Sequence, residues 1–341
     1  MSIVSYILRR LIFATFVVAG VLVITFVISN IVPNDPARLY AGARAKPEQV
    51  AAVREKLGLN DTLAVQFGRY VSTLARGDFG ESFKTRRAIS EDLKTFFPAT
   101  MELVVFAMLL ALIIGIPIGV LSAAQRGTWV DNLSRVITIA GVSIPSFWLA
   151  ILLQLLFFSA LDWLPLSGRL SRTIMLVEPI ETITGFYSID GILTRNWSAW
   201  RNALWHLILP VVVLATYPIS LIARMTRAAM IEVLEEPYIR TAKASGLPFM
   251  QVLFRRALKN AFIPTLTVLG LTFAASITGA VLVEIIFAWP GIGKYVTDAI
   301  IATDFPVIVA VTLIVTIVYV LINLLVDVIQ ALLDPRIELG R

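Results

Sequence analysis

The feature of the sequence that most constrains its fold is a set of six long apolar runs. Each is close to the roughly 20 residues that an α-helix needs to cross a bilayer. They lie at 11–32, 99–124, 133–159, 205–228, 262–288 and 306–333. Only 15% of the residues are charged, against roughly 25% in soluble domains, so a soluble fold could not bury this apolar surface. We predict an all-α polytopic membrane protein with six transmembrane helices.

The chain offers few side chains for catalysis or metal binding. It has no cysteine and a single histidine, His206, which excludes disulfides, thiolate metal sites and most histidine-based acid–base schemes. The GIGK run at 291–294 is not a phosphate-binding loop, because Ala288 and Tyr295 stand where that loop has Gly and Ser or Thr. We therefore predict no catalytic residue, no metal site and no cofactor in this chain.

Lysine and arginine in the short loops indicate orientation, because these residues concentrate on the cytoplasmic side. If the N-terminus is cytoplasmic, thirteen of the 29 basic residues fall on that side and five fall in short outer loops. The other eleven lie in the segment 33–97, and loops of this length largely escape the rule. We predict that both termini are cytoplasmic and that the net charge of +6 reflects topology, not nucleic-acid binding.

The spans and loops divide the chain into parts. These are the N-terminus and first membrane helix at 1–32, an extracytoplasmic cap at 33–97, a five-helix core at 98–333 and a cytoplasmic tail at 334–341. The core includes an outer loop at 160–204 and a cytoplasmic loop at 231–261. We interpret the first apolar run as an uncleaved anchor, because it is longer than the apolar region of a signal peptide and ends at Pro33. In the cap, PEQVAAVREKL has helical apolar spacing and Gly58 is placed to end that helix.

The cytoplasmic loop is the most informative segment. Over 235–264 it reads EEPYIRTAKASGLPFMQVLFRRALKNAFIP. Pro237 suits the first turn of a helix, and Gly246 followed by Pro248 suits its end. The small residues before Gly246 would let another backbone approach closely. The residues alone are consistent with two roles for this loop: a docking element for a partner, or a basic loop that lies against anionic lipid.

This loop resembles the ATPase-docking loop of binding-protein-dependent ABC importer permeases, and within them the peptide, nickel and opine branch. The resemblance rests on YIRTAKASG at 238–246 and RALKNAFIP at 256–264. Further segments are similar to the first permease of that branch and occur in the same order: YILRRL (6–11), VPNDPA (32–37), GDFGESF (77–83), PATMEL (98–103), GIPIGVLSA (115–123), SIPSFWLAILL (143–153), LPLSGRL (164–170), TGFYSID (184–190), HLILP (206–210), VEIIFAWPGIG (283–293) and LLDPRI (332–337). Arg240 departs from the broad family pattern, which has Glu there, and this departure is usual in the peptide branch.

The resemblance implies a type I ABC importer permease fold in the bacterial inner membrane. It also implies a heterodimer with a homologous second permease, two ATP-binding cassette ATPase subunits that bind ATP and Mg²⁺, and an extracytoplasmic solute-binding protein. The implied docking residues are Tyr238, Arg240, Thr241, Ala242, Lys243, Ala244, Gly246, Arg255 and Arg256. The expected solute is a di- or oligopeptide, although relatives carry oligosaccharides, opines, glutathione or nickel chelates.

Three polar residues in predicted membrane helices are candidates for function, because polar groups are costly inside a bilayer. They are Glu284, Asn323 and Asp327. The alternative for each is an interhelical hydrogen bond or a position near a helix end. An ion-driven secondary transporter would need coupling groups near the midplane and usually an internal repeat, and neither is evident. A membrane-embedded enzyme would need a catalytic constellation, which one histidine and no cysteine do not supply.

Overall fold

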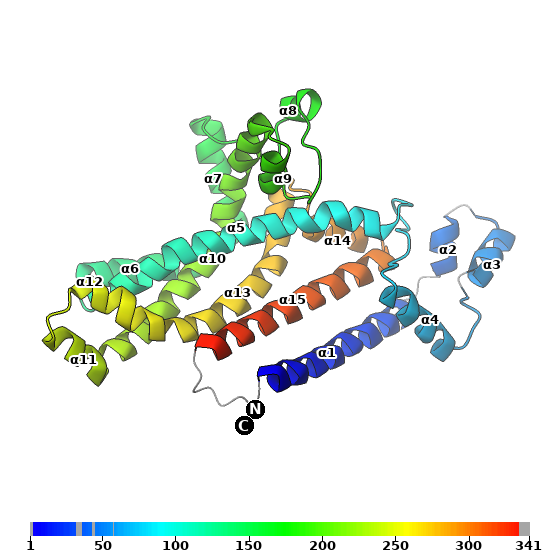
Figure 1. Ribbon diagram of the computed structural model, residues 1–341. Helices are drawn as coiled ribbons and strands as arrows, with labels where there is room; N and C mark the ends of the chain where they lie inside the picture. The colour runs from blue at the N-terminus through cyan, green and yellow to red at the C-terminus, as the bar shows by residue number, and fades with distance from the viewer. Residues whose placement is uncertain (1–2, 32–35, 43–44, 57, 334–341) are drawn as a thin grey trace. The chain divides into compact units, whose positions relative to one another are not determined.

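The computed structural model describes residues 3–31, 36–42, 45–56 and 58–333. Over these residues the chain is helical, and the one isolated β-bridge joins Glu81 to Ala88. The helices shown in Figure 1 are α1 (Ile3–Ile31), α2 (Pro36–Ala41), α3 (Pro47–Lys56), α4 (Leu63–Ala75), α5 (Ile89–Ala124), α6 (Trp129–Ser143), α7 (Ser146–Gln154), α8 (Arg172–Val177), α9 (Tyr187–Leu193), α10 (Trp197–Leu234), α11 (Pro237–Ala244), α12 (Phe249–Gln251), α13 (Leu258–Ile286), α14 (Ile292–Ile301) and α15 (Phe305–Leu333). Two π-helical turns follow α7 and α12, at Leu155–Ala160 and Val252–Ala257.

Five helices are long and apolar enough to span a membrane, and the bent pair α6 and α7 makes a sixth if it counts as one span. The five are Ile7–Ile28 within α1, then Ile89–Ala124, Trp197–Leu234, Phe249–Ile286 and Phe305–Leu333. The prediction of an all-α polytopic membrane protein is confirmed. Several helices are longer than the corresponding apolar runs, because polar residues at their ends are also helical.

The region 133–159 differs from the continuous helix that the sequence predicts. α6 ends at Ser143, α7 begins at Ser146, and the two segments meet at an angle of 100°. Pro145 is the cause, because the residue before a proline is disfavoured in the α-helical region. That residue, Ile144, has extended backbone angles of φ −77° and ψ 121°.

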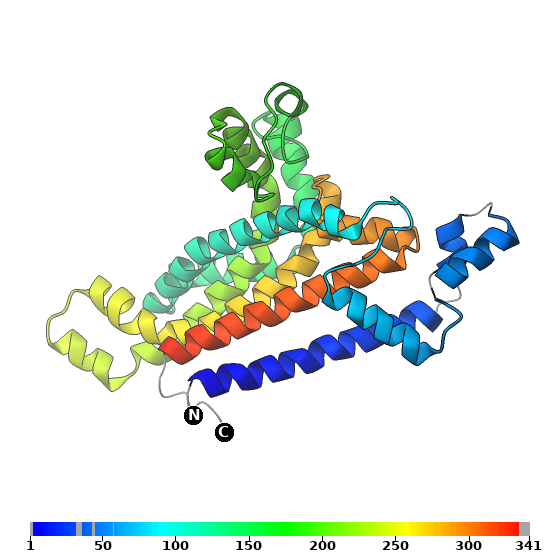
Figure 2. The ribbon, with the colours of Figure 1, turned by 45° about the vertical axis from the view of Figure 1, so that its right-hand side comes forward.

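Contacts divide the chain into two compact units, Met1–Ile7 with Phe96–Lys294 and Tyr319–Arg341, and Leu8–Thr95 with Tyr295–Val318. In the first unit, α10 packs against α6, α7, α9 and α13. α8 and α9 lie near one end of α10, and α11 lies at the other (Figures 1 and 2). A Cβ added to Gly119 of α5 would lie 2.6 Å from the carbonyl oxygen of Ala223 in α10. Glycine at this position therefore lets the two helices pack backbone to backbone.

The second unit includes α1, α3 and α4. Here α1 and α4 pack through aromatic rings, with the centroids of Phe26 and Phe67 5.2 Å apart. The Tyr70 hydroxyl lies 3.0 Å from Thr25 Oγ1, and burial raises the pKa of Tyr70. The prediction of a helix that starts at Pro47 and is stopped by Gly58 is confirmed, because α3 ends at Lys56 and Gly58 has φ +64°.

Some sequence predictions fall on residues that the structure does not describe. They are the turn after the first helix, with Pro33, and the tail at 334–341, with Arg336 and Arg341.

Candidate functional site

The segment Pro237–Ala257, which we call the loop hairpin, has the local conformation that its sequence predicts. α11 begins with Pro237 in its first turn and ends at Ala244, and Gly246 follows at φ +76°. Glycine adopts this left-handed conformation without the steric cost that a Cβ imposes. α11 then packs against the π-helical turn Val252–Ala257, so the two arms of the hairpin lie together beyond the end of α10 (Figure 1).

The inner face of the loop hairpin is packed onto the ends of other helices. Ile239, Val252 and Leu253 are fully buried. They share a core with Val120 and Ala123 of α5, Ala229 and Met230 of α10, and Ala257 and Ala261. Fully burying one large aliphatic side chain contributes about 1.5–3 kcal/mol. The hairpin is therefore fixed to α5 and α10 and is not a loose connection.

The outer face carries the basic residues that the sequence analysis selected and, beside them, apolar side chains that it missed. Among the selected residues Ala242 is half-buried, and the others are exposed: Tyr238, Arg240, Thr241, Lys243, Ala244, Gly246, Arg255 and Arg256. Beside Tyr238, which is 41% exposed, the side chains that were missed are Phe249, Met250 and Phe254, which are between 38% and 58% exposed. Exposed apolar groups bordered by polar residues mark a surface for interaction. The signal available in the sequence was the uncharged run from Leu247 to Phe254.

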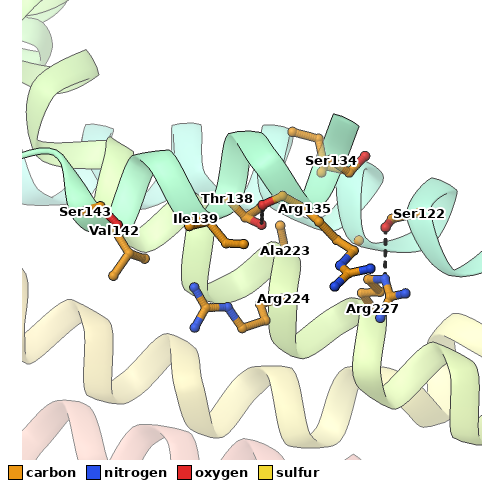
Figure 3. Close-up of a pocket in the computed structure, with 12 residues that line it drawn as sticks. Ser122, Ser134, Arg135, Thr138, Ile139, Val142, Ser143, Ala223, Arg224 and Arg227 are labelled. Atoms are coloured by element: carbon orange, nitrogen blue, oxygen red, sulfur yellow. Dashed lines mark hydrogen bonds between the residues drawn. The ribbon is translucent and has the colours of Figure 1, made fainter. Parts of the chain in front are cut away.

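A pocket of about 430 Å³ lies between α5, α6 and α10 (Figure 3). Arg135, Arg224 and Arg227 are among the residues that line it. Arg227 forms a two-point ion pair with Asp131, with Nε 2.7 Å from Oδ1 and Nη2 2.9 Å from Oδ2. Ser122 Oγ donates to the same Oδ1 at 2.7 Å. The ion pair therefore joins α6 to α10, and the hydrogen bond of Ser122 adds α5. The sequence analysis did not foresee this contact.

Glu284, a candidate for function from the sequence, is fully buried near the end of α13. Its Oε1 accepts a hydrogen bond from Thr100 Oγ1 of α5 at 2.5 Å, and its Oε2 accepts one from the Lys294 N–H at 2.8 Å. Thr100 Oγ1 in turn accepts from the Ile292 N–H at 2.8 Å. The first N–H groups of a helix have no partner within it. Glu284 and Thr100 together supply acceptors for the start of α14.

We expect Glu284→Gln to change stability by less than about 3 kcal/mol, the upper value for a hydrogen bond to a charged group. The amide oxygen still accepts from the Lys294 N–H, and the amide NH₂ can donate to Thr100 Oγ1. The melting temperature in mild detergent is one measurement, and the rate of solute uptake, the activity that the sequence resemblance implies, is the other. Glu284→Leu, which removes every acceptor, is the matched control and is expected to lower the melting temperature further. Loss of uptake in Glu284→Gln with an unchanged melting temperature would show that the carboxylate has a functional role.

A second buried carboxylate, Glu102 of α5, pairs with Arg169. The two side chains are 1% and 4% exposed, and Arg169 Nη2 lies 2.6 Å from Glu102 Oε2. The same Nη2 donates to the Gly185 carbonyl oxygen at 2.8 Å, and the Ser188 N–H donates to Glu102 Oε1 at 2.7 Å. The Arg169 guanidinium lies 3.7 Å from the centroid of the Tyr187 ring. These contacts fix the segment around α9 onto α5.

The two remaining candidates from the sequence lie one turn apart on α15. Asn323 Nδ2 donates to the Tyr319 carbonyl oxygen at 3.0 Å, a contact within its own helix. Asp327 is half-buried. The hydrogen bond of Asn323 does not link it to the cluster around Glu284.

Comparison with known proteins covers nearly the whole chain. The family described as "Binding-protein-dependent transport system inner membrane component" matches residues 115–339, and the N-terminal family of the same membrane components matches residues 3–104. A probable D,D-dipeptide transport system permease protein, DdpB of Escherichia coli K12, is 49% identical over 95% of this chain and 94% of its own length. The dipeptide transport system permease protein DppB of Alkalihalophilus pseudofirmus is 43% identical over 98% and 99% of the two chains. The glutathione transport system permease protein GsiC of Salmonella paratyphi A is 36% identical over 98% and 99%.

These matches agree with the order of motifs along the sequence and with the helical architecture. They make the chain a multi-pass transport subunit of the inner membrane, which works with a binding protein and an ATPase and is not itself an enzyme. The chain belongs to the family of inner-membrane permease components of binding-protein-dependent transport systems.

Proposed function

We propose that this permease imports di- or oligopeptides, dipeptides above all. Support comes from full-length relatives whose names specify dipeptides, at 49% and 43% identity. Glutathione, named for a relative at 36% identity, is itself a short peptide. Oligosaccharides, opines and nickel chelates are the solutes that the test below must distinguish from peptides.

The proposed assembly contains this chain, a homologous second permease, two ATPase subunits and a solute-binding protein. ATP and Mg²⁺ bind to the ATPase subunits and not to this chain. The loop hairpin supports this arrangement, because one such hairpin per permease offers one docking surface. A pair of ATPases then requires a pair of permeases.

The proposed orientation places both termini and the segment 231–261 in the cytoplasm. The segment 33–97 and the loop 160–204 then face the outside. Support comes from the thirteen basic residues on the cytoplasmic side against five in the short outer loops.

The proposed coupling mechanism rests on one observation: the inner face of the loop hairpin is buried against other helices and its outer face is exposed. The ATPase docks on the outer face, through Tyr238, Arg240, Thr241, Lys243, Ala244, Gly246, Arg255 and Arg256, together with the exposed Phe249, Met250 and Phe254. Ala242, which was also selected from the sequence, packs against the inner core. ATP binding closes the ATPase pair and displaces α11. Because Ile239 and Leu253 are buried against α5 and α10, the displacement passes into helices of the permease core. The transporter then changes between outward-open and inward-open states.

Purification of the tagged chain from its native membrane, followed by native mass spectrometry, tests this proposal. We expect a complex with one copy of this chain, one second permease, two ATPase copies and a binding protein that carries a ligand of dipeptide mass. A binding protein loaded with a sugar or a metal chelate would contradict the peptide assignment. A complex without an ATPase, together with uptake driven by an ion gradient, would contradict ATP-driven import.

A further inference from the structure

The pocket between α5, α6 and α10 is strongly basic. None of the twelve residues that line it is acidic, and three of them are arginines. The ion pair with Asp131 compensates the charge of Arg227. Arg135 and Arg224 are exposed at the pocket, and within residues 58–333 and the other described segments neither forms an ion pair with an acidic side chain. Two guanidinium groups are therefore available to a ligand.

The pocket lies between places where the helices are in close contact. α5 meets α10 at Gly119, where an added Cβ would lie 2.6 Å from the Ala223 carbonyl oxygen. α6 meets α10 at Gly141, where an added Cβ would collide with Ser220 Oγ. In Figure 3 Arg135 comes from α6 and Arg224 from α10, and both line the pocket.

We propose that this pocket binds the carboxylate of the transported peptide through the guanidinium groups of Arg135 and Arg224. The choice of a peptide rests on the proposed function. A peptide carries a C-terminal carboxylate whose ordinary pKa is about 3.5, so it is charged at neutral pH. A guanidinium is planar and donates two parallel hydrogen bonds to a carboxylate. The aliphatic residues Ile118, Ile139 and Val142 of the lining offer apolar surface to the rest of the solute.

A phospholipid headgroup is the other anion that could enter. The lining favours a small polar solute over a lipid, because it carries the hydroxyl groups of Ser122, Ser134, Thr138 and Ser143 beside the arginines. An acyl chain needs a continuous apolar groove, and these hydroxyls interrupt the wall.

The pocket also adjoins the base of the loop hairpin. Ser122 and Arg227 line it, and the neighbouring residues Ala123 and Ala229 belong to the core that holds α11. A displacement of α11 therefore changes the walls of the pocket. This places peptide release under the control of the ATPase, on the cytoplasmic side in the proposed orientation.

The test uses the complete transporter in proteoliposomes, with the binding protein and radiolabelled L-alanyl-L-alanine outside and ATP inside. The variant is Arg135→Gln with Arg224→Gln, and peptide uptake per ATP hydrolysed is measured beside peptide-stimulated ATPase activity. We expect uptake per ATP to fall roughly tenfold, the effect of losing a charge-assisted hydrogen bond, while stimulation of the ATPase persists.

Two further variants serve as controls. Lysine at both positions keeps the positive charge but lacks the planar guanidinium group, and it is expected to restore part of the uptake. Arg201→Gln, which removes an exposed arginine of α10 outside the pocket, is the matched control and is expected to behave as the wild type.

The possible outcomes separate this inference from the proposed function. Wild-type liposomes that take up no dipeptide would overturn the peptide assignment, and with it a peptide carboxylate in the pocket. Normal uptake per ATP in the double glutamine variant would overturn the pocket alone. An anionic phospholipid that native mass spectrometry finds on the wild type, and not on the variant, would also overturn it, because the arginines would then hold a lipid.

Discussion

Replacing Arg169 by methionine is expected to lower the stability of the protein by about 3–5 kcal/mol, the typical cost of removing one partner from a buried ion pair. Arg169 and Glu102 are 4% and 1% exposed, so the substitution leaves the carboxylate in a buried position without its ion-pair partner. Glu102 keeps its hydrogen bond from the Ser188 N–H, which does not neutralise its charge. The segment around α9 would also lose the contact between Arg169 and the Gly185 carbonyl oxygen.

The melting temperature of the purified protein in mild detergent measures this effect. Arg172→Met is the matched control, because Arg172 is exposed and lies three residues away in the sequence, and it is expected to leave the melting temperature unchanged. The double variant Arg169→Met with Glu102→Gln removes the unpaired charge and is expected to recover much of the loss. A melting temperature for Arg169→Met equal to that of the control would show that the ion pair contributes nothing to stability.

Replacing Gly246 by tryptophan is expected to abolish peptide-stimulated ATPase activity in the assembled transporter while the chain still inserts and folds. Gly246 has φ +76° and nothing within 4 Å of an added Cβ. The indole ring therefore projects from the outer face of the loop hairpin, where the ATPase is proposed to dock. The backbone itself loses on the order of 1–2 kcal/mol, because a residue with a Cβ is strained in this conformation.

Gly77→Trp separates the docking effect from the backbone strain. Gly77 also has φ +76° and nothing within 4 Å of an added Cβ, but it lies in the segment 33–97, which is proposed to face the other side of the membrane. We expect this variant to keep normal stimulation of the ATPase. Full stimulation in Gly246→Trp would mean that the ATPase docks elsewhere. Equal loss in both variants would mean that strain, and not docking, is responsible.

The sequence predicted those parts of the fold that are encoded locally. The loop hairpin could be predicted because Pro237 and Gly246 each act on the backbone of their own helix. The same holds for α3, which Gly58 follows, and for the long apolar runs, whose length alone indicates a span. The bend after α6 could not be predicted firmly, because membrane helices also tolerate proline without a sharp break and the apolar pattern continues on both sides of Pro145.

The candidate site was harder to predict, because its polar contacts join residues that are distant in the sequence. Nothing near Glu102 indicates that Arg169 neutralises it, and nothing near Glu284 indicates that Thr100 donates to it. Similarly, the alternation of buried and exposed residues around Ile239 is too short to show which face packs onto α5. Pairings of this kind follow from the tertiary arrangement and leave no local pattern.

In both of these buried contacts, the two residues are synthesised at different times. Glu102 and Arg169 are 67 positions apart, and Thr100 and Glu284 are 184 apart. When α5 first enters the bilayer during synthesis, Glu102 faces a cost of insertion with its partner not yet made, and Glu284 arrives much later. A chain truncated before residue 169 keeps an unpaired acid in the membrane, and a chain truncated before residue 284 leaves Thr100 without its acceptor. Cellular proteolysis removes incompletely folded chains, so we expect fragments that lack either partner to be degraded faster than the complete permease.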